Sequence, residues 1–196
     1  MFDIGKVIVH FDVGRAAEVL GRPAGLSTQQ VLERVQSDAK LLDFQEGRLS
    51  PQDWYAYLAA QLHFSFSFEE FRTIWCSALD PTPLLEEELF RELGARFRLA
   101  LLSNTDPLHV AQLESRYAFL RHFPARVYSC RVGMSKLRPE IYAHAAQQAG
   151  AAPRETLYVD DIPEYVEAGR RAGLESLLFT GRESLLDELR RRGLLA

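Results

Sequence analysis

Three short apolar runs constrain the fold of this chain more than any other feature. They span Val7–Phe11, Phe97–Leu102 and Thr156–Val159, and polar or turn residues bound each of them. Short runs rich in aliphatic and aromatic residues are typical of strands buried on both faces of a sheet. Two weaker runs, Arg126–Ser129 and Ser176–Phe179, have a similar character. The sequence therefore predicts a sheet of short, buried strands.

Helical patterns separate and follow these runs. Ser50–Asp53 has the order of a helix start, with a serine, a proline and then an acid, and Ser67–Glu70 forms a capping box. Strand–helix alternation in the second half of the chain favours a parallel sheet with helices on both faces. Further helices are predicted over Pro107–Tyr117, Pro139–Ala149, Pro163–Ala172 and Arg182–Arg192.

Residues 14–90 have a different pattern, because they show helical periodicity without a strand. We therefore expect an α/β core made of residues 1–13 and 91–196, with residues 14–90 inserted after the first strand as a helical unit. The aromatic residues of the insertion are expected to form its own core. They are Trp54, Tyr55, Tyr57, Phe64, Phe66, Phe68, Phe71 and Trp75.

Composition and charge exclude several classes of protein. With 196 residues, 47% of them hydrophobic, the chain suffices for one folded core with a modest insertion. The net charge of −4 gives no general reason to bind nucleic acid or an anionic membrane. No apolar run reaches the length of a membrane span, and the first residues do not resemble a signal peptide. Cys76 and Cys130 do not make a disulfide framework or a zinc site, so a reducing cytoplasm is expected.

Polar residues that could carry chemistry stand at the ends of the predicted strands. Asp3 follows the first apolar residue pair, while Ser103–Thr105 and Asp160–Asp161 each follow an apolar run directly. Lys136 lies in a loop between the last two. Because ligands of doubly wound sheets bind at the carboxyl ends of the strands, we expect these side chains to converge on one edge.

This set of side chains suits the chemistry of a phosphate ester. Clustered carboxylates repel one another and need a counter-charge, which Mg²⁺ supplies through oxygen ligands. A lysine and a hydroxyl can hold phosphate oxygens, and a free carboxylate can attack phosphorus. Taken singly, Asp160–Asp161 could be a turn or helix cap and Lys136 a surface residue. The order of the signals favours the functional interpretation.

That order resembles the motif order of the haloacid dehalogenase superfamily of hydrolases over nearly the whole chain. The likeness is greatest to the phosphatase-like branch with a small helical cap between the first and second motifs. It implies a Rossmann-like three-layer α/β/α core with a parallel sheet, and an α-helical cap over residues 14–90, inserted after the first strand. The segments that carry the resemblance are Phe2–Val9, Leu101–Thr105, Val132–Lys136 with Pro139–Tyr142, and Tyr158–Glu164.

The resemblance also implies roles for the catalytic and phosphate-binding residues. Asp3 would be the nucleophile. Ser103 would bind the transferring phosphoryl group together with the backbone of Asn104. Lys136 would neutralise both the phosphate and the nucleophile. The implied partner is a small phosphorylated substrate.

For the metal, the resemblance implies a Mg²⁺ ion at the same strand ends. Asp3, the carbonyl of Gly5 and Asp161 would be its protein ligands. Asp160 would support either the metal or Lys136. We expect near-octahedral oxygen coordination completed by water.

Gly5 departs from the pattern of most phosphatases of the superfamily, which carry a second Asp at this position. The branch that this chain resembles also has Gly there, so the departure is compatible with activity but leaves the general acid unassigned. His10 and Asp12, close behind the first motif, are candidate substitutes. We therefore expect better activity on aryl or acyl phosphates, whose leaving groups need little protonation.

Three further positions differ from the branch. Lys6 stands where it has Gly or Asn, Leu137–Arg138 replace a Pro-Asp pair, and Tyr165 replaces a frequent Asn. Only two residues precede Asp3, whereas the family has a full strand there. Either the first strand is a stub, or residues are missing from the start of the chain.

The sequence thus predicts a Mg²⁺-dependent phosphatase that hydrolyses a small phosphorylated metabolite, such as a sugar phosphate, through an aspartyl-phosphate intermediate. One alternative is a catalytically weak binding or regulatory protein with the same fold, which Gly5, Lys6 and Leu137 favour. Another is a metal-independent haloacid dehalogenase, against which the acid pair Asp160–Asp161 argues. A signalling receiver domain fits less well, because its acid pair comes early in the chain and it has no cap.

Overall fold

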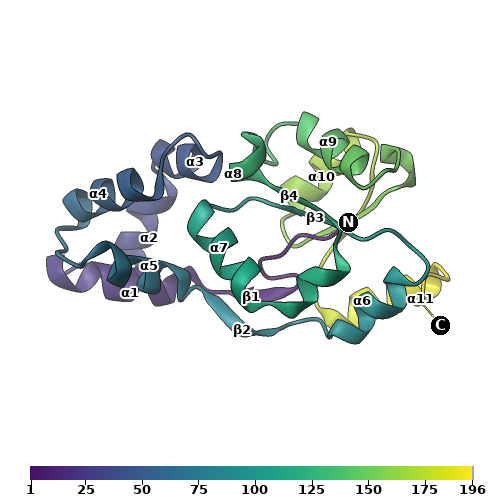
Figure 1. Ribbon diagram of the computed structural model, residues 1–196, viewed down its shortest axis with the longest axis horizontal. Helices are drawn as coiled ribbons and strands as arrows, with labels where there is room; N and C mark the ends of the chain where they lie inside the picture. Colours follow the sequence, from purple (N-terminus) through teal and green to yellow (C-terminus); the bar gives the residue numbers. More distant parts are fainter. Residues whose placement is uncertain (196) are drawn as a thin grey trace.

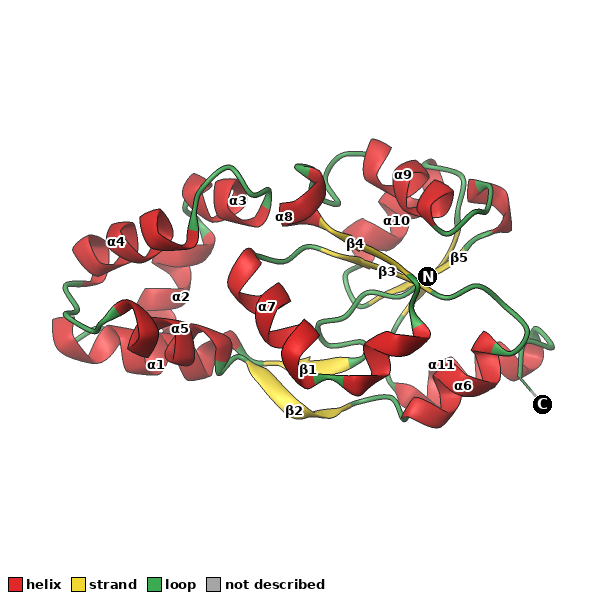
Figure 2. Cartoon of the chain, viewed as in Figure 1, coloured by secondary structure: helices red, strands yellow, loops and turns green. Residues whose placement is uncertain are grey.

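Parallel strands lie at the centre of the computed structural model, which describes residues 1–195 (Figure 1). With the helices around them they give the chain a mixed α/β fold (Figure 2). The central strands form two parallel pairs: β3 (Ala100–Ser103) with β4 (Ala125–Tyr128), and β5 (Leu157–Asp160) with β6 (Glu175–Leu178). All four of these strands are short, and β3, β4 and β5 are almost wholly buried.

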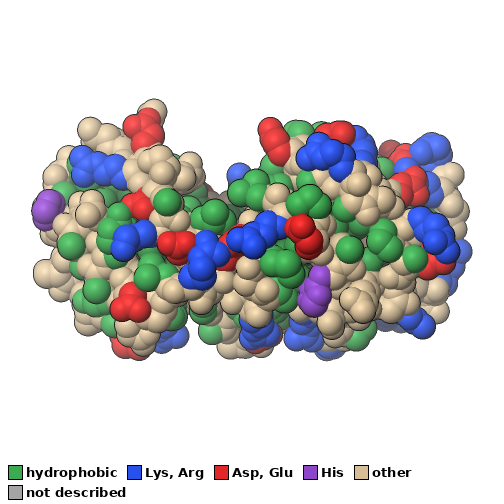
Figure 3. Space-filling view, turned by 90° about the horizontal axis from the view of Figure 1, so that it is seen from above, with side chains coloured by type: hydrophobic (Ala, Val, Ile, Leu, Met, Phe, Trp, Pro, Cys, Tyr) green, Lys and Arg blue, Asp and Glu red, His purple; other side chains and the backbone are tan. Residues whose placement is uncertain are grey.

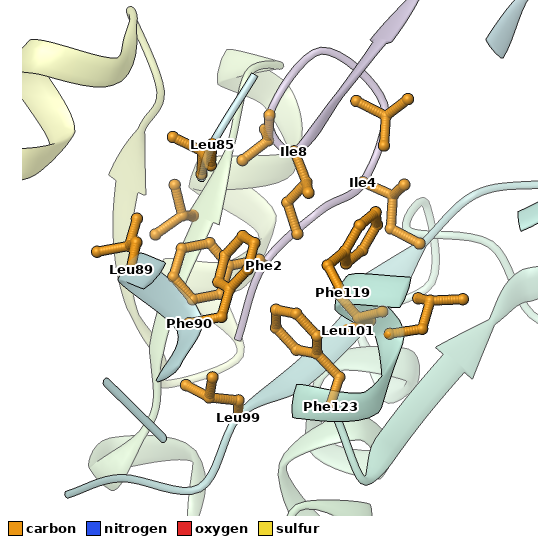
Figure 4. Close-up of a cluster of buried hydrophobic side chains, with 14 of the residues drawn as sticks. Phe2, Ile4, Ile8, Leu85, Leu89, Phe90, Leu99, Leu101, Phe119 and Phe123 are labelled. Carbon is orange, nitrogen blue, oxygen red and sulfur yellow. The ribbon is translucent and has the colours of Figure 1, made fainter. Parts of the chain in front are cut away.

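Phe2 joins the two pairs of strands. It forms parallel bridges with Leu101 of β3 and with Val159 of β5. The backbone N–H of Phe2 donates to the Ala100 carbonyl, and that of Asp3 donates to the Val159 carbonyl, both at 2.9 Å. The Phe2 ring is buried against Phe90, Leu101 and Phe123 (Figure 4). The N-terminal residues therefore occupy the middle of the central strands.

The expectation that Val7–Phe11 forms a buried strand of the parallel sheet is wrong. After Asp3 the chain turns back sharply, because the N–H groups of Ile8 and Val9 both donate to the Ile4 carbonyl at 2.9 Å. The residues that follow leave the centre as an antiparallel ribbon, in which β1 (Val9–Phe11) pairs with β2 (Leu79–Pro83).

The other predicted strands are confirmed with small shifts of their ends. The run at 97–102 begins as a strand only at Ala100, and Phe97 is 39% exposed. Both weaker runs form strands, β4 and β6. Side chains of β3 alternate between two buried clusters, with Leu101 in one and Leu102 in the other. Helices therefore pack against both faces of this strand.

The predicted helices are confirmed, together with their start signals. The Ser50 hydroxyl accepts a hydrogen bond from the N–H of Asp53 at 3.1 Å, and Ser67 and Glu70 cap each other. The corresponding helices are α4 (Pro51–Leu62), α5 (Phe68–Cys76), α7 (Pro107–Arg116), α9 (Glu140–Gln148), α10 (Pro163–Arg171) and α11 (Arg182–Arg191). The remaining helices outside residues 13–76 are α6 (Glu87–Gly94), α8 (Ser129–Val132) and the short 3-10 turns Ala118–His122 and Pro153–Glu155.

Residues 13–76, here called the helical segment, lie to one side of the strands (Figure 1). The segment has a hydrophobic cluster of its own, in which Trp54 stacks on Phe44 with ring centres 5.2 Å apart. All eight aromatic residues predicted for its core belong to or pack against this cluster. Its elements, besides α4 and α5, are α1 (Val13–Gly21), the 3-10 turn Arg22–Ala24, α2 (Thr28–Gln36) and α3 (Ala39–Gln45).

The expectation that residues 14–90 contain no strand is wrong, because β2 brings the chain back from the helical segment. The strand pairs with β1, so the two connections between the parts run side by side (Figure 2). Prolines at 81 and 83 concealed the strand in the sequence. Proline cannot donate to a ladder and is tolerated on an edge strand such as this one.

A second contact joins the far end of the helical segment to the strands. The carbonyl of Gln45 accepts a hydrogen bond from the Ser129 hydroxyl at 2.6 Å. A Cβ atom on Gly47 would lie only 2.2 Å from the Cys130 carbonyl oxygen, so only glycine fits there. Between the two contacts the molecule is hollowed, as Figure 3 shows from one side. Within residues 1–195, no helix has the length and apolar character needed to cross a membrane.

Candidate active site

Asp3, Lys136 and Asp160 form a buried cluster of charges. The Lys136 Nζ atom lies 2.7 Å from Asp3 Oδ1 and 2.6 Å from Asp160 Oδ2. The Lys136 side chain is 1% exposed, and both carboxylates are buried. Burying three charges is unfavourable unless they are paired, and here one ammonium group bridges two carboxylates. The expected proximity of these residues is therefore found.

The backbone holds each member of the cluster at the end of a strand or loop. Asp3 follows the bridging residue Phe2, and Asp160 is the last residue of β5. The loop before α9 carries Lys136, and its N–H donates to Asn104 Oδ1 at 2.8 Å. Asp160 also accepts the Ile162 N–H at 2.8 Å, which fixes its second oxygen.

Tyrosine side chains enclose the lysine, which the sequence analysis did not foresee. The Lys136 Nζ atom lies 5.3 Å from the ring centre of Tyr165 and 5.6 Å from that of Tyr158. The Tyr158 hydroxyl also donates to Asp160. The Tyr165 hydroxyl accepts from Asn104 Nδ2 at 3.1 Å, so this departure from the family pattern contacts the candidate site directly. Tyr158 lies within a predicted strand, and no feature of the neighbouring sequence distinguishes it from an aromatic residue of the hydrophobic core.

Asp161 adds a third carboxylate to the cluster. Asp3, Asp160 and Asp161 each offer an oxygen atom, and these oxygens lie within 4.8 Å of one another. Asp161 is only partly buried and lines the same cavity as Asp3 and Gly5. Hard divalent cations bind carboxylate oxygens in such groups. The donor set of these residues fits Mg²⁺.

The pKa shifts of the clustered residues also indicate a site that lacks positive charge. Burial raises the pKa of Asp3 to about 6; Lys136 lowers this pKa, and Asp160 raises it. Burial and then the charge of Asp160 raise the pKa of Asp161. For Lys136, burial lowers the pKa, but the two carboxylates outweigh this effect and raise it overall. One lysine therefore leaves the three carboxylates short of positive charge.

Ser103 and Asn104 reach the same place from the end of β3. Ser103 is the last residue of that strand and is buried, and both residues line the cavity with Asp3 and Lys136. The next residue, Thr105, is fixed by its N–H, which donates to the Ser129 hydroxyl at 2.9 Å. Every predicted site residue except Asp160 lines the cavity that contains Asp3. Asp160 instead contacts the Lys136 ammonium group, which lines that cavity.

The cavity has a volume of about 330 Å³ and lies between the strand ends and the helical segment. Polar groups that include Asp3, Ser103 and Lys136 line it on one side. Side chains of α1, α2 and α3 line it on the other. It lies at the hollow between the two parts of the molecule and has the size of a small-molecule site, about 300–1,000 Å³.

The two candidate substitutes for the missing acid do not line this cavity. His10 is exposed and lies with Asp12 along a neighbouring hollow that also contains Lys6 and Asp161. Asp12 caps α1, since its Oδ1 atom accepts the Gly14 N–H at 2.9 Å. The sequence placed His10 and Asp12 near Asp3, but the chain after the turn at Ile4 places them along the neighbouring hollow.

Lys6 and Leu137–Arg138, which differ from the family pattern, lie around the cluster. Lys6 has a left-handed backbone with φ of 58°, the conformation that the family's Gly or Asn at this position adopts readily. Its charge acts to lower the pKa of Asp161, against burial. Leu137 is 66% exposed, and Arg138 points toward Glu46, at 3.5 Å. The changes after Lys136 therefore do not prevent the lysine from reaching the cluster.

A second buried ion pair borders the cavity and was missed by the sequence analysis. His109 Nδ1 lies 2.6 Å from Asp106 Oδ2, and His109 Nε2 lies 3.1 Å from the Trp75 carbonyl oxygen. Both partners are acceptors, which favours the protonated imidazole, in which both ring nitrogens donate. The Trp75 indole N–H donates to Asp106 at 3.0 Å. The position of Asp106 before Pro107 indicates a helix cap. Its contact with Trp75 could not be predicted, because Trp75 comes from the helical segment.

The mixed α/β fold brings a lysine and three carboxylates together at the ends of its central strands, as the order of the motifs implies for a hydrolase of this superfamily. The chain belongs to the haloacid dehalogenase-like hydrolases, whose family model matches residues 7–173.

Known relatives and structures agree with this assignment. A D-ribitol-5-phosphate phosphatase of Bacteroides thetaiotaomicron is 24% identical over 182 residues, which cover 90% of this chain and 88% of the relative. A sesquiterpene phosphatase of Aspergillus oryzae is 30% identical over 153 residues, 75% of this chain and 76% of the relative. A haloacid dehalogenase family enzyme from B. thetaiotaomicron, crystallised with magnesium and inorganic phosphate, superposes with a TM-score of 0.80 at 23% identity over 92% of each chain. This last likeness establishes the fold.

Proposed function

We propose that this protein is a Mg²⁺-dependent phosphatase that acts on a small phosphorylated metabolite through an aspartyl-phosphate intermediate. The observation that carries the proposal is the position of Lys136 between Asp3 and Asp160, with Asp161 completing a group of three carboxylates. The named activities of the relatives, on ribitol phosphate and on a sesquiterpene, support a phosphorylated organic substrate.

The proposal also divides the chain into a core and a cap. Residues 1–13 and 91–196 would form a Rossmann-like three-layer core, and residues 14–90 a helical cap over the site. The hydrophobic cluster confined largely to the helical segment supports a separate cap. The clusters on opposite sides of β3 support helices in two outer layers.

The residues present fit a magnesium ion beside the nucleophile. Asp3, Asp161 and the Gly5 carbonyl would hold it, and Asp160 would support it or Lys136. When bound, Mg²⁺ neutralises negative charge on the carboxylates and on the phosphate oxygens. The raised pKa values of Asp3 and Asp161 support this assignment, because a cation would favour their charged forms.

The chain's own residues would carry the two chemical steps. A carboxylate oxygen of Asp3 attacks phosphorus, and the bond from phosphorus to the ester oxygen breaks as the alcohol leaves. Lys136 and Ser103 hold the phosphoryl oxygens in place, which stabilises the charge that develops on them. A water molecule then attacks the phosphoryl group, which releases inorganic phosphate and restores Asp3.

The leaving alcohol needs a proton, and the position that usually supplies one is Gly5. Neither His10 nor Asp12 lines the cavity beside Asp3. We therefore expect aryl and acyl phosphates to be hydrolysed faster than alkyl phosphates, unless a cap residue or the substrate itself supplies the proton.

A screen of phosphorylated metabolites, with and without Mg²⁺, tests the proposal. A phosphatase should release phosphate from a clearly preferred substrate only when Mg²⁺ is present. Release of halide from a 2-haloacid without metal would instead identify a dehalogenase. No turnover of any substrate would favour the binding or regulatory alternative, for which the charge of Lys6 near Asp161 is the specific structural argument.

A further inference from the structure

The wall of the cavity that faces Asp3 is formed by the helical segment and is almost entirely apolar. The segment contributes side chains from α1, α2, α3 and Trp75 of α5. Leu20, Leu32, Val35 and Leu41 are typical of this wall. Among the described residues, its polar exceptions are the amides of Gln36 and Gln45, and none of its side chains is charged.

Three polar side chains elsewhere around the cavity, those of Asn104, Asp106 and His109, are already engaged within the protein. Both oxygens of Asp106 accept hydrogen bonds, from backbone N–H groups and from Trp75 and His109. The second nitrogen of His109 donates to a carbonyl. Both ends of the Asn104 amide are bonded to Lys136 and Tyr165. These groups are therefore poor partners for the hydroxyls of a bound sugar.

The cavity is thus polar at the end that contains Asp3, Ser103 and Lys136 and apolar beyond it. A phosphate ester that enters with its phosphoryl group at the polar end must place its organic group against the apolar wall. Most hydroxyls on that group would lose their water for few hydrogen bonds, since the wall offers only the amides of Gln36 and Gln45 among its described side chains, whereas alkyl or aryl carbons would gain contacts.

We propose that the substrate is the phosphate monoester of a short apolar alcohol, alkyl or aryl, rather than a polyol or sugar phosphate. This inference rests on the proposed phosphatase function and names the substrate class of the same site. The cavity volume of about 330 Å³ restricts the organic group to a small one, since it lies near the lower end of the usual range.

A pair of esters with the same carbon chain tests the inference. Pentyl phosphate and ribitol 5-phosphate both release a primary alcohol with five carbons, and they differ in hydroxyls. We expect kcat/KM to be about 100-fold higher for pentyl phosphate, the scale on which an apolar site discriminates against added hydroxyls. Equal or better hydrolysis of ribitol 5-phosphate would overturn the inference and leave the phosphatase function standing.

Two matched variants locate the discrimination in the wall. Leu32 and Leu49 both pack partly buried against the same hydrophobic cluster, but only Leu32 lines the cavity. Leu32→Gln should lower the ratio of pentyl to ribitol activity by about tenfold or more, because a polar group then enters the wall. Leu49→Gln should leave the ratio unchanged, even if it lowers the unfolding temperature by as much as Leu32→Gln does. A ratio that both variants change equally would contradict the inference.

Binding provides a test that does not depend on turnover. With Mg²⁺ present, calorimetry on Asp3→Asn should show pentyl phosphate binding at least about tenfold more tightly than ribitol 5-phosphate. If the screen of phosphorylated metabolites finds no turnover by wild type but this preference holds, the phosphatase proposal fails while the apolar site stands. If the two esters bind equally, the apolar site is wrong.

Discussion

The Asp3 carboxylate and the Lys136 ammonium group lie 2.7 Å apart in a place where both side chains are buried. The two residues come from distant parts of the chain, the first from the N-terminal bridge and the second from the loop before α9. Lys136 also contacts Asp160, so the pair is one edge of a larger cluster. A buried cluster with excess negative charge beside a cavity is typical of functional sites.

Asp3→Asn should abolish phosphatase activity without unfolding the protein. The amide cannot form the acyl-phosphate, while Lys136 keeps its contact with Asp160. Phosphate release and urea denaturation measure the two properties separately. Asp187→Asn, on the exposed face of α11, is the control and should remain active. Near wild-type turnover by Asp3→Asn would exclude Asp3 as the nucleophile.

Mg²⁺ should raise the thermal unfolding temperature of wild type, because it binds a group of carboxylates that repel one another in its absence. Asp161→Asn should need at least about tenfold more Mg²⁺ for the same shift. Excess EDTA should remove the phosphatase activity, and added Mg²⁺ should restore it. Full activity in the chelator would contradict the metal site.

Gly5→Asp should increase activity on an alkyl phosphate relative to an aryl phosphate by at least about tenfold, if the new carboxyl group supplies the missing proton. The backbone can accept the side chain, since a Cβ atom at Gly5 would lie 3.6 Å from its nearest neighbour, the Phe11 Cβ. Gly5→Asn is the matched control, with the same shape and no acid. If wild type already prefers the alkyl ester, and His10→Ala and Asp12→Ala leave that preference unchanged, the missing-acid argument is wrong.

The ion pair of His109 and Asp106 should make stability depend on pH. Burial lowers the pKa of His109, but contact with Asp106 outweighs it and raises the pKa above the usual 6.5. Burial raises the pKa of Asp106, but His109 and backbone hydrogen bonds outweigh it and lower the pKa below the usual 3.8. The pair therefore contributes fully between about pH 4 and 6.5, and less as the pH rises through the raised pKa of His109.

Urea denaturation of wild type and His109→Gln at pH 5.5 and pH 9 checks this expectation. The variant should lose about 3 kcal/mol at the lower pH, as for a broken buried pair, and less at the higher pH. His144→Gln is a suitable control, because His144 forms no ion pair within residues 1–195 and is only half-buried on α9. A loss that is the same at both pH values would contradict a charged His109.

Helix starts and the aromatic core of the helical segment could be predicted from sequence for a local reason. A cap such as Ser50 or Ser67 bonds to residues within three positions, so its pattern is complete in a short window. The aromatic core of the helical segment was predictable because its members are dense in one stretch of the chain.

The prediction of the first strand was wrong because it relied on local apolar character, whereas the central position is decided by pairing with strands far along the chain. Val7–Phe11 is the most strand-like run near the N-terminus, yet Phe2 has the central place. Only Phe2 has β3 and β5 on either side, and its ring is buried against Phe90 of α6 and Phe123, which follows the 3-10 turn at 118–122. Hydrogen bonds to the Ile4 carbonyl then turn the chain away.

The sequence by itself determined which side chains were available for chemistry and the order in which the strand ends present them: Asp3, Ser103, Lys136 and the pair Asp160–Asp161. Tertiary structure alone decided that Lys136 bridges Asp3 and Asp160, that His10 lines a neighbouring hollow, and that the wall facing the site is mostly apolar. The physical reason is distance along the chain. Strand and cap signals depend on near neighbours, whereas burial and ion pairing depend on which remote segments the packing brings together.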